Sequence, residues 1–461
     1  MTLTNSIDES GGNSEGISDQ LQPVILNSIR NILPDEMIER TCKDIGYSFR
    51  RRKITPVVTV LHMVMAALWP EESFNACWQV LWDTFISWFP HLNGHALSRG
   101  RVAEARARLP LRLWQRLFAL LSDKAQCLSE AYDKWKGHRV VLADGTCVSM
   151  SAETELFEAF GVNTGYHGCG RYPLARLVSL CMAGTMTIID YAIGGYQDGE
   201  STLTFGILKS LRKGDLLVAD RHFAAAHFYV RYQSMGLEFL TRAHQCLKIS
   251  RVKRRLCYNA NDFIGRLNIS KNYRRRDPLL PASIDVRFIQ AKLWIRGRRT
   301  VVWFATSLLD AKRYPAQQIV QLYARRWRIE TLFRELKIPL SADVLRSQSP
   351  DGVRKEIIAR LTALNVVRSI MLEAAVKAKM SDPLRISFAH AVRAIISFSA
   401  ALSRVPLALV WDVYQAMLVE IACHVNPERP GRLEPRAVCR DHKHYPSLRM
   451  TRAHWRARHA A

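Results

Sequence analysis

The spacing of hydrophobic and polar positions divides the chain into three kinds of region. Up to residue 136 the apolar stretches have helical length, as in Thr55 to Leu68, where Pro56 suits the first turn of a helix. From residue 139, short apolar runs typical of buried strands alternate with helical stretches. Beyond about residue 315 the pattern is helical again. The sequence therefore predicts a mixed α/β centre between a helical N-terminal region and a helical C-terminal region.

The predicted elements of the centre follow one order, which is strand, strand, strand, helix, strand, helix, strand. They are expected over Arg139–Asp144, Leu177–Met182, Thr187–Ile193, Glu200–Leu211, Leu216–Asp220, Phe223–Met235 and Leu237–Arg242. This is the order of an RNase H-like α/β fold with a mixed sheet. Strand-like segments mixed with basic clusters then occupy residues 243–310. They predict a β-rich insertion into the core.

Charge suggests a partner for these regions. The 461 residues contain 66 Lys and Arg against 41 Asp and Glu, a formal net charge of +25. Nucleic acid is the usual partner of a large basic protein, and an anionic membrane surface is the alternative. The longest apolar run, Val57 to Trp69, is too short to span a bilayer, and the first residues are acidic rather than typical of a secretory signal. We therefore expect a cytoplasmic, nucleoid-associated protein with no membrane contact.

Six parts are expected along the chain. They are a flexible acidic lead (1–20), a helical N-terminal DNA-binding domain (21–136), the first part of the RNase H-like core (137–242), the β-rich insertion domain (243–310), the second part of the core (311–375), and a helical C-terminal region with a basic tail (376–461). Basic side chains of the N-terminal region fall at Arg50–Lys53 and along a predicted helix from Ser98 to Leu109. Each could follow a DNA backbone or form a solvated face, and the net charge favours DNA.

Cysteine and histidine spacing gives little sign of a metal site. The ten cysteines form no C-x-x-C pair, which excludes a zinc ribbon of that kind. A weak candidate remains near the C-terminus, in Cys423, His424, Cys439, His442 and His444. Solvated polar residues in a basic tail are the simpler interpretation.

Three carboxylates are candidates for catalysis. Asp144 and Asp220 follow predicted buried strands, and Glu330 lies on a long helix predicted from about Pro315 to Lys337. If the strands are neighbours, the three carboxylates could hold two divalent cations, an arrangement that stabilises both oxygens of an in-line phosphoryl transfer. Mg²⁺ suits such oxygen ligands. Each Asp alone is weak support, because Asp-Gly is also an ordinary turn.

The long helix is more informative. Tyr323, Arg326, Glu330 and Lys337 fall within about 60° of one another at ~100° per residue. The apolar positions of the same helix are Leu322, Ile329, Leu332, Phe333 and Leu336. A surface helix with spaced salt bridges is the alternative. It does not account for a Tyr, an Arg, a carboxylate and a Lys on one face.

This spacing, Y-x2-R-x3-E-x6-K, resembles the signature of the DDE transposases of the insertion-sequence-4 family. The resemblance extends to Asp144-Gly-Thr, to Gly214-Asp-Leu-Leu-Val-Ala-Asp220-Arg and to Leu345-Arg346-Ser347, and it covers roughly residues 33–455. One departure is His222, where that family would have a small or amide residue. It leaves the carboxylates intact and adds a titrating group near them.

The resemblance implies roles for particular residues. Asp144, Asp220 and Glu330 would be the catalytic ligands of two Mg²⁺ ions, which Mn²⁺ could replace. Tyr323, Arg326, Lys337 and Arg346 would contact phosphates of the transposon end. Trp303, with Trp294 as second choice, would stack on a flipped base, although a core Trp is an equal alternative. Further DNA contacts are expected from Arg51, Arg52, Lys53, Arg106, Arg254 and Arg255. Glu200 also matches a family position but is better explained as the first residue of a helix.

The implied function is cut-and-paste transposition. Its partners would be double-stranded DNA, both the terminal inverted repeats and the target, and a second copy of the chain. The free 3′-OH would attack the opposite strand, giving a hairpin intermediate, and later the target. Two alternatives stay open: a catalytically inactive DNA-binding relative, and an RNase H-like nuclease without strand transfer.

Overall fold

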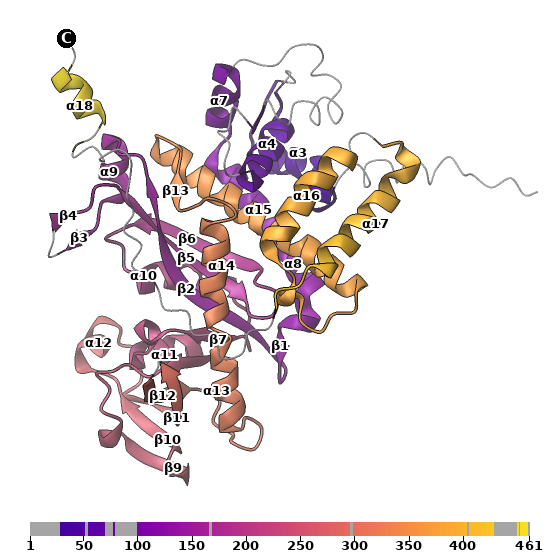
Figure 1. The fold of residues 1–461 in the computed structure, drawn as a ribbon. Coiled ribbons are helices and arrows are strands. Elements are labelled where there is room, and N and C mark those ends of the chain that lie inside the picture. The colour runs from indigo at the N-terminus through magenta and orange to yellow at the C-terminus, as the bar shows by residue number, and fades with distance from the viewer. Residues whose placement is uncertain are drawn as a thin grey trace, which may run out of the picture.

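The computed structural model describes residues 28–50, 54–69, 77–78, 99–165, 168–295, 298–402, 405–427, 450 and 452–459. Within these residues the fold is a mixed α/β arrangement around a central sheet, with helices gathered at one end and further strands at the other (Figure 1). The N-terminal and C-terminal helices meet at the helical end. The acidic lead and most of the basic tail lie outside the described residues.

One half of the sheet has five strands in the order β6-β5-β2-β7-β8. Their bounds are β2 His138–Met150, β5 Leu174–Met182, β6 Ile188–Gly195, β7 Leu216–Ala219 and β8 Glu238–Arg242. The pairs β2 with β5 and β5 with β6 are antiparallel, whereas β2, β7 and β8 run parallel. The sheet is therefore mixed, as the order of apolar runs predicts.

The first strand is longer than predicted. The sequence predicts a strand that ends in a turn at Asp144-Gly145, but β2 continues to Met150. The reason is pairing, because β5 matches β2 residue by residue from Val141 to Ser149. Asp144 is therefore held inside a regular strand rather than in a turn.

Both faces of this sheet are covered. Alternate residues of β2 face opposite sides: Val140 and Leu142 belong to one apolar cluster, which includes residues of α14 and α15, whereas Val141 and Ala143 belong to another, which includes residues of α10 and α11. Strands covered on both faces are continuously apolar, which explains the short runs without alternation. The bounds are α10 Glu200–Ile207, α11 Ala226–Ser234, α14 Trp327–Lys337 and α15 Pro350–Lys377.

Residues 253–306 extend the same sheet. Strand β12 pairs antiparallel with β8, and the order continues as β12-β11-β10-β9. The bounds are β9 Lys253–Asn259, β10 Asp262–Asn268, β11 Ser283–Ile295 and β12 Arg298–Thr306, with helix α12 at Lys271–Arg276. These strands form the lower part of the molecule in Figure 1. The insertion thus continues the central sheet; the predicted domain limits remain predictions.

The helical end combines both termini of the described chain. Helix α4 is buried along its whole length and starts at the Thr55 cap, whose hydroxyl accepts a hydrogen bond from Val58 N at 3.3 Å. Helix α15 packs between α4 and α8 and against α16 and α17. The bounds are α2 Ser28–Ile32, α3 Asp35–Asp44, α4 Pro56–Leu68, α7 Arg99–Arg108, α8 Leu111–Asp133, α16 Phe388–Leu402, α17 Leu407–Cys423 and α18 Arg452–His459. None of the described helices has the length and apolarity to cross a bilayer.

The predicted long helix is divided in two. Helix α13 covers Ala316–Ala324 and α14 covers Trp327–Lys337. At the junction Arg325 N and Arg326 N donate to the carbonyls three residues earlier, at 3.0 Å each, which tightens the turn. Arg326 keeps a helical conformation, with φ −54° and ψ −35°. The side chains therefore follow helical spacing only approximately across the junction.

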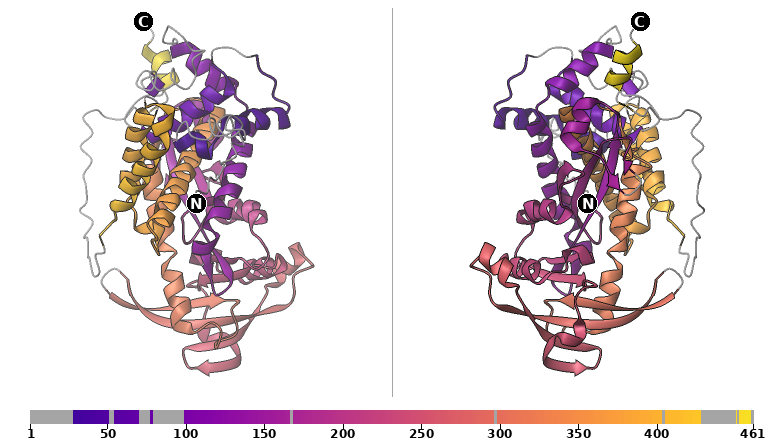
Figure 2. Two further views of the ribbon diagram at one scale, coloured as in Figure 1. Left: turned by 90° about the vertical axis from the view of Figure 1, so that its right-hand side faces the viewer. Right: turned by 90° about the vertical axis from the view of Figure 1, so that its left-hand side faces the viewer.

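The remaining elements are short. They are β1 Lys134–Trp135, α9 Thr154–Phe160, β3 Thr164–Gly165, β4 Gly168–Cys169, β13 Val344–Leu345 and the 3-10 turns η2 Leu208–Ser210, η3 Arg221–Phe223, η4 Ile249–Arg251 and η5 Pro383–Arg385. Both β1 and β13 pair with β2. Figure 2 shows the sheet edge-on, with helices covering it at the upper end and strands spreading at the lower end.

Candidate active site

Asp144 and Asp220 lie side by side on the sheet. Strands β2 and β7 are parallel, and their register pairs Ala143 with Ala219. The next residue of each strand is the aspartate, so the two carboxylates stand at neighbouring positions on one edge of the strand pair. The sheet therefore brings together two residues that are 76 positions apart in the sequence.

Glu330 reaches the same place from helix α14. One guanidinium links the two elements: Arg326 Nη1 lies 3.0 Å from Asp144 Oδ2, and Arg326 Nη2 lies 3.2 Å from Glu330 Oε1. Arg326 is 6% exposed, whereas the side chain of Glu330 is 46% exposed. Arg326 is thus a buried bridge between strand and helix, and Glu330 faces open space.

Two cavities of about 860 Å³ each meet at these residues. Asp220, Arg326 and Glu330 line both of them. One cavity also contains Asp144, Phe333, Arg334 and Lys337, and the other contains Arg221, Arg242, Leu293, Val302, Tyr323 and Trp327. An extended anionic chain crossing the site would thus meet carboxylates at the centre and basic groups on both sides.

The carboxylates are crowded enough to perturb one another. Burial raises the pKa of Asp144 to about 6, and the charges of Glu200 and Asp220 add to the rise. Arg326 and the Gly145 amide, which donates to Asp144 Oδ1 at 2.9 Å, act in the opposite direction without cancelling it. A bound cation between these groups would lower the pKa of Asp144 again.

Glu200 lies beside the carboxylates of the site and is also the residue at which a helix begins. It is the first residue of α10, as the sequence predicts. A Cβ at position 145 would lie 2.9 Å from the Glu200 carboxyl carbon, so Gly145 leaves the room that the carboxyl group needs. Burial raises the pKa of Glu200, and the charge of His222 lowers it, which places the unexpected histidine beside the acidic group.

The donor set fits a hard divalent cation. The side chains of Asp144, Asp220, Glu330 and Glu200 offer only carboxylate oxygens, the ligands that Mg²⁺ prefers. A single arginine contacts two of them, so the negative charge at this point exceeds the positive charge. These residues could hold a divalent cation.

Other residues of the signature are close by but not all on one surface. Lys337 lines the cavity with Asp144, and its Nζ lies 3.8 Å from Asp343 Oδ1. Tyr323 is 7% exposed with its ring 4.8 Å from that of Phe304. Burial raises the pKa of Tyr323 to about 12. Its phenol therefore stays protonated and can donate a hydrogen bond. The five predicted apolar positions of the helix are all buried.

The predicted DNA contacts outside the signature are scattered. Arg346 is exposed beside β13, and Arg254 and Arg255 lie on the fully exposed strand β9, where the Arg254 guanidinium sits 4.3 Å from the Phe263 ring. Arg106 is only half-buried on α7, and burial, opposed by the charge of Glu356, lowers the pKa of its guanidinium. Its head group thus faces the protein more than solvent. Arg51, Arg52 and Lys53 lie outside the described residues.

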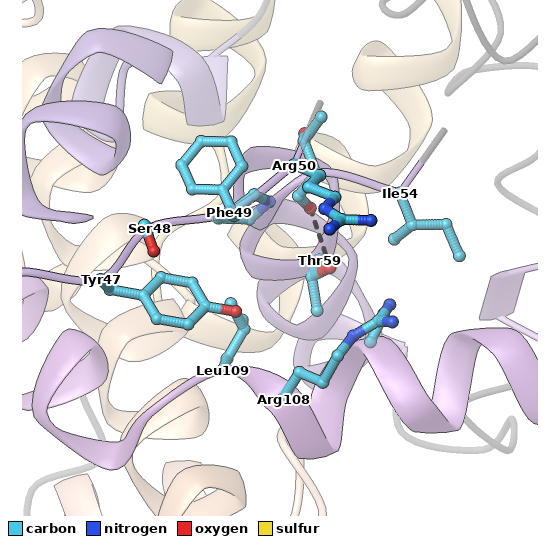
Figure 3. Close-up of a pocket in the computed structure, with 11 residues that line it drawn as sticks. Tyr47, Ser48, Phe49, Arg50, Ile54, Thr59, Arg108 and Leu109 are labelled. Carbon is cyan, nitrogen blue, oxygen red and sulfur yellow. Dashed lines mark hydrogen bonds between the residues drawn. The ribbon is translucent and has the colours of Figure 1, made fainter. Parts of the chain in front are cut away.

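A further basic cavity lies in the N-terminal region. Figure 3 shows Arg50 and Arg108 pointing into a cavity of about 230 Å³ from two segments of the N-terminal region. Tyr47 and Phe49 line it, and their rings are stacked at 6.3 Å. The sequence pointed to the charge of this region but not to a cavity with aromatic walls.

The aromatic residue in the site is not the one that the sequence suggests first. Trp303 on β12 packs edge-to-face on Phe263 at 5.8 Å, and its neighbour Val302 lines the cavity instead. Since successive strand residues face opposite sides, Trp303 points away from the cavity. Trp327 lines it, is 57% exposed, and carries the Arg326 guanidinium 5.0 Å from its ring. The sequence signal that could have pointed to Trp327 is its position directly after the signature residue Arg326. The side chain of Trp294 lies outside the described residues.

Comparisons with known proteins bear on the family of this chain. A family model described as "Transposase DDE domain" matches residues 135–366, just over half of the chain. The transposase InsG for insertion sequence element IS4 of Escherichia coli (strain K12) is 23% identical over 428 residues, which cover 90% of this chain and 92% of that protein. A cryo-EM structure of the piggyBac transposase synaptic complex with hairpin DNA is 11% identical, with a TM-score of 0.42 over 90% of this chain and 88% of that one.

The matched segment contains the whole constellation, from Asp144 to Lys337. Enzymes with this domain transfer nucleotidyl groups on DNA, and they generally use divalent metal ions. The resemblance seen in the signature agrees with the similarity to an insertion-sequence-4 transposase. The chain belongs to the DDE transposase family.

Proposed function

We propose that this transposase cuts DNA at the ends of its element and joins the freed 3′-OH to target DNA at one site built from Asp144, Asp220 and Glu330. The observation that carries the proposal is the register of β2 and β7, which sets the two aspartates side by side, together with Arg326, which ties Glu330 to Asp144. Carboxylates from two strands and one helix thus converge on one cavity.

The core that holds this site is proposed to be RNase H-like. The order β6-β5-β2-β7-β8, with three antiparallel strands followed by two strands parallel to β2, supports this assignment. The proposal includes the six parts of the chain, with the boundaries that the sequence predicts.

Each residue of the site has a separate task. When bound, two Mg²⁺ ions, or Mn²⁺ in their place, would stabilise charge on the attacking and leaving oxygens. Asp144, Asp220 and Glu330 would hold them. Arg326 positions Asp144 and Glu330 through its two amino groups. Lys337 would bind a phosphate, Arg346 would contact DNA nearby, and Tyr323 would donate a hydrogen bond to a phosphate oxygen.

DNA would reach the site along basic surfaces on both sides of it. Arg221 and Arg242 line one cavity, and Arg334 and Lys337 line the other. Arg254 and Arg255 on the exposed strand β9 and the cluster Arg51 to Lys53 would bind further along the DNA. Such contacts are independent of sequence and weaken with salt. The N-terminal helices would recognise the terminal inverted repeats. Arg106 on α7 would be one of the contacting residues, although it is less exposed than the others.

Second-strand cleavage is proposed to pass through a DNA hairpin. This step requires a nucleotide to leave the helix, and an exposed aromatic ring beside the carboxylates would hold it. Trp327 has that position, so it is favoured over Trp303. A homodimer would bring two element ends together. Because the proposed substrate is DNA, the protein would be cytoplasmic and associated with the nucleoid.

The proposal is tested with linear DNA that carries the element ends. Wild-type protein with Mg²⁺ or Mn²⁺ should nick at the ends, form hairpins and join 3′ ends to a plasmid. Glu330→Ala should bind the same DNA with unchanged affinity and make none of these products. Normal cleavage by Glu330→Ala would refute the site.

The same assay separates the alternatives. Binding without cleavage by the wild type would indicate an inactive DNA-binding relative. Cleavage without joining would indicate a nuclease. Loss of hairpins alone in Trp327→Ala, with Trp303→Ala as the matched control, would support the stacking role of Trp327.

A further inference from the structure

A second group of metal-compatible side chains lies on the C-terminal helices α16 and α17, neither of which lines the candidate active site. It consists of His390 on α16, Glu420 on α17 and His424 directly after α17. One ligand atom from each residue lies within 4.8 Å of the other two. Only His424 belongs to the C-terminal candidate seen in the sequence, and Cys439, His442 and His444 lie outside the described residues.

The distances suit a small transition-metal ion. His390 Nε2 lies 3.0 Å from Glu420 Oε1, and His424 Nδ1 lies 3.6 Å from the same oxygen. Tetrahedral ligands at bond lengths of about 2.0–2.1 Å are roughly 3.3 Å apart. The two separations bracket this value, so the spacing of these atoms suits an ion once the rings turn their nitrogens toward it.

The backbone already holds the two histidines together. The segments that flank the helices form a bridge between Ile386 and Val425, and Ser387 N donates to the His424 carbonyl at 2.8 Å. The His424 Nδ1 also lies 3.0 Å from the Glu420 carbonyl, a contact that the ring must give up if Nδ1 binds an ion. The backbone of the two histidine segments is thus held in place by contacts that do not depend on a metal.

The imidazoles of His390 and His424 lie stacked, 3.5 Å apart at an angle of 15°. A neutral imidazole binds a metal through a ring nitrogen, and the ion then lies in the plane of the ring. Both rings must therefore turn about their side-chain bonds before they can bind one ion.

We propose that His390, Glu420 and His424 form a binding site for Zn²⁺ or a similar transition-metal ion, separate from the Mg²⁺ site of catalysis. Imidazole nitrogen favours Zn²⁺, whereas the all-carboxylate active site favours Mg²⁺. Three protein ligands leave a fourth position for water, and the partly exposed side chains give the ion access. The ion would fasten the end of α17 to the start of α16.

Binding is measured on the full chain with Asp144→Asn, Asp220→Asn and Glu330→Gln in place, so that the active site cannot contribute. After removal of metal with a chelator, Zn²⁺ is titrated by calorimetry, and Co²⁺ absorption reports the ligands. We expect one equivalent of Zn²⁺, a higher melting temperature with Zn²⁺, and no such response to Mg²⁺. Adding His390→Gln or His424→Gln should weaken Zn²⁺ binding more than about tenfold, since even outer-shell changes cost 10–100-fold.

Three further variants keep the test decisive. His227→Gln, a ring stacked on Tyr273 outside the group, should bind as the parent does. Glu420→Gln keeps the side-chain shape and should weaken binding if a histidine variant does not fold. Cys439→Ser with His442→Gln and His444→Gln should leave binding unchanged. The proposal is overturned if no equivalent binds, if the His390 variant binds normally, or if only the Cys439 variant loses binding.

Discussion

Two regions of the molecule contain carboxylates beside a buried arginine, and they differ in how far the arginine balances the negative charge. In the extended part of the sheet, Arg287 is fully buried and contacts both oxygens of Asp262, at 2.8 and 2.6 Å. Its remaining amino group donates to the carbonyls of Leu308 and Tyr314 at 3.2 and 2.7 Å. In the candidate active site, Arg326 is shared by Asp144 and Glu330, with Asp220 and Glu200 close by.

The difference separates a structural ion pair from a site that requires a ligand. A one-to-one pair with all donors satisfied repays the cost of removing two charges from water. A cluster with more carboxylates than cations does not, and burial raises the pKa of Asp144 to about 6 as a result. We expect substitutions in the first region to lower stability and substitutions in the second to lower activity.

The largest effect is expected at Asp220. Asp220→Asn keeps the oxygen that accepts from Arg221 N at 2.5 Å and removes one negative charge from the cluster. Cleavage of end-bearing DNA should fall about 10²–10³-fold, the range known for losing one preorganised group that stabilises charge in an active site. The free energy of unfolding, from urea denaturation, should stay the same or rise because a like-charge repulsion is gone. A clear drop in stability would show that Asp220 is a structural residue, and the comparison would fail.

Arg287 should behave in the opposite way. Arg287→Ala leaves the Asp262 carboxylate buried without its partner, which typically costs about 3–5 kcal/mol of unfolding free energy. The loss should appear in urea denaturation, while the fraction that remains folded cleaves DNA at the normal rate. The matched control is the double variant Arg287→Met with Asp262→Leu, which removes both charges. It should recover most of the stability, and failure to do so would mean that packing rather than charge explains the loss.

Arg326 tests the shared bridge itself. Arg326→Lys keeps the positive charge but cannot reach Asp144 and Glu330 with two separate amino groups. Cleavage should fall about 10–100-fold, the usual cost of changing a residue that orients metal ligands. The Mg²⁺ concentration that gives half-maximal cleavage should rise as well, which a purely structural role would not produce. Arg328→Lys, at a half-exposed pair with Asp382, is the control and should change neither quantity.

The candidate site follows from the sequence more directly than its surroundings do. Asp144, Asp220 and Glu330 are candidates because strand-end aspartates and helical spacing are local patterns, and the strand register brings the first two together. The extension of β2 past Gly145 was missed because it depends on pairing with β5, a contact that no local pattern encodes. Trp327 and Glu200 were undervalued for the same reason, since their exposure and their neighbours are set by the tertiary fold.

The smallest effect is expected from Glu200, through the pKa of Asp144. The pKa of Asp144 is raised, so its carboxyl group takes up a proton as the pH falls through about 6, and cleavage, which needs the carboxylate, should fall in the same range. Glu200→Gln removes one charge that raises this pKa, so the acid limb of the pH–rate profile should move to lower pH. More Mg²⁺ should move the limb in the same direction, because a cation competes with the proton for the same oxygens. Glu155→Gln, a change at an exposed acidic residue of α9, should leave the profile in place. If Glu200→Gln moves the limb upward, Glu200 does not act on Asp144 by charge, and the excess of acid at this site has another origin.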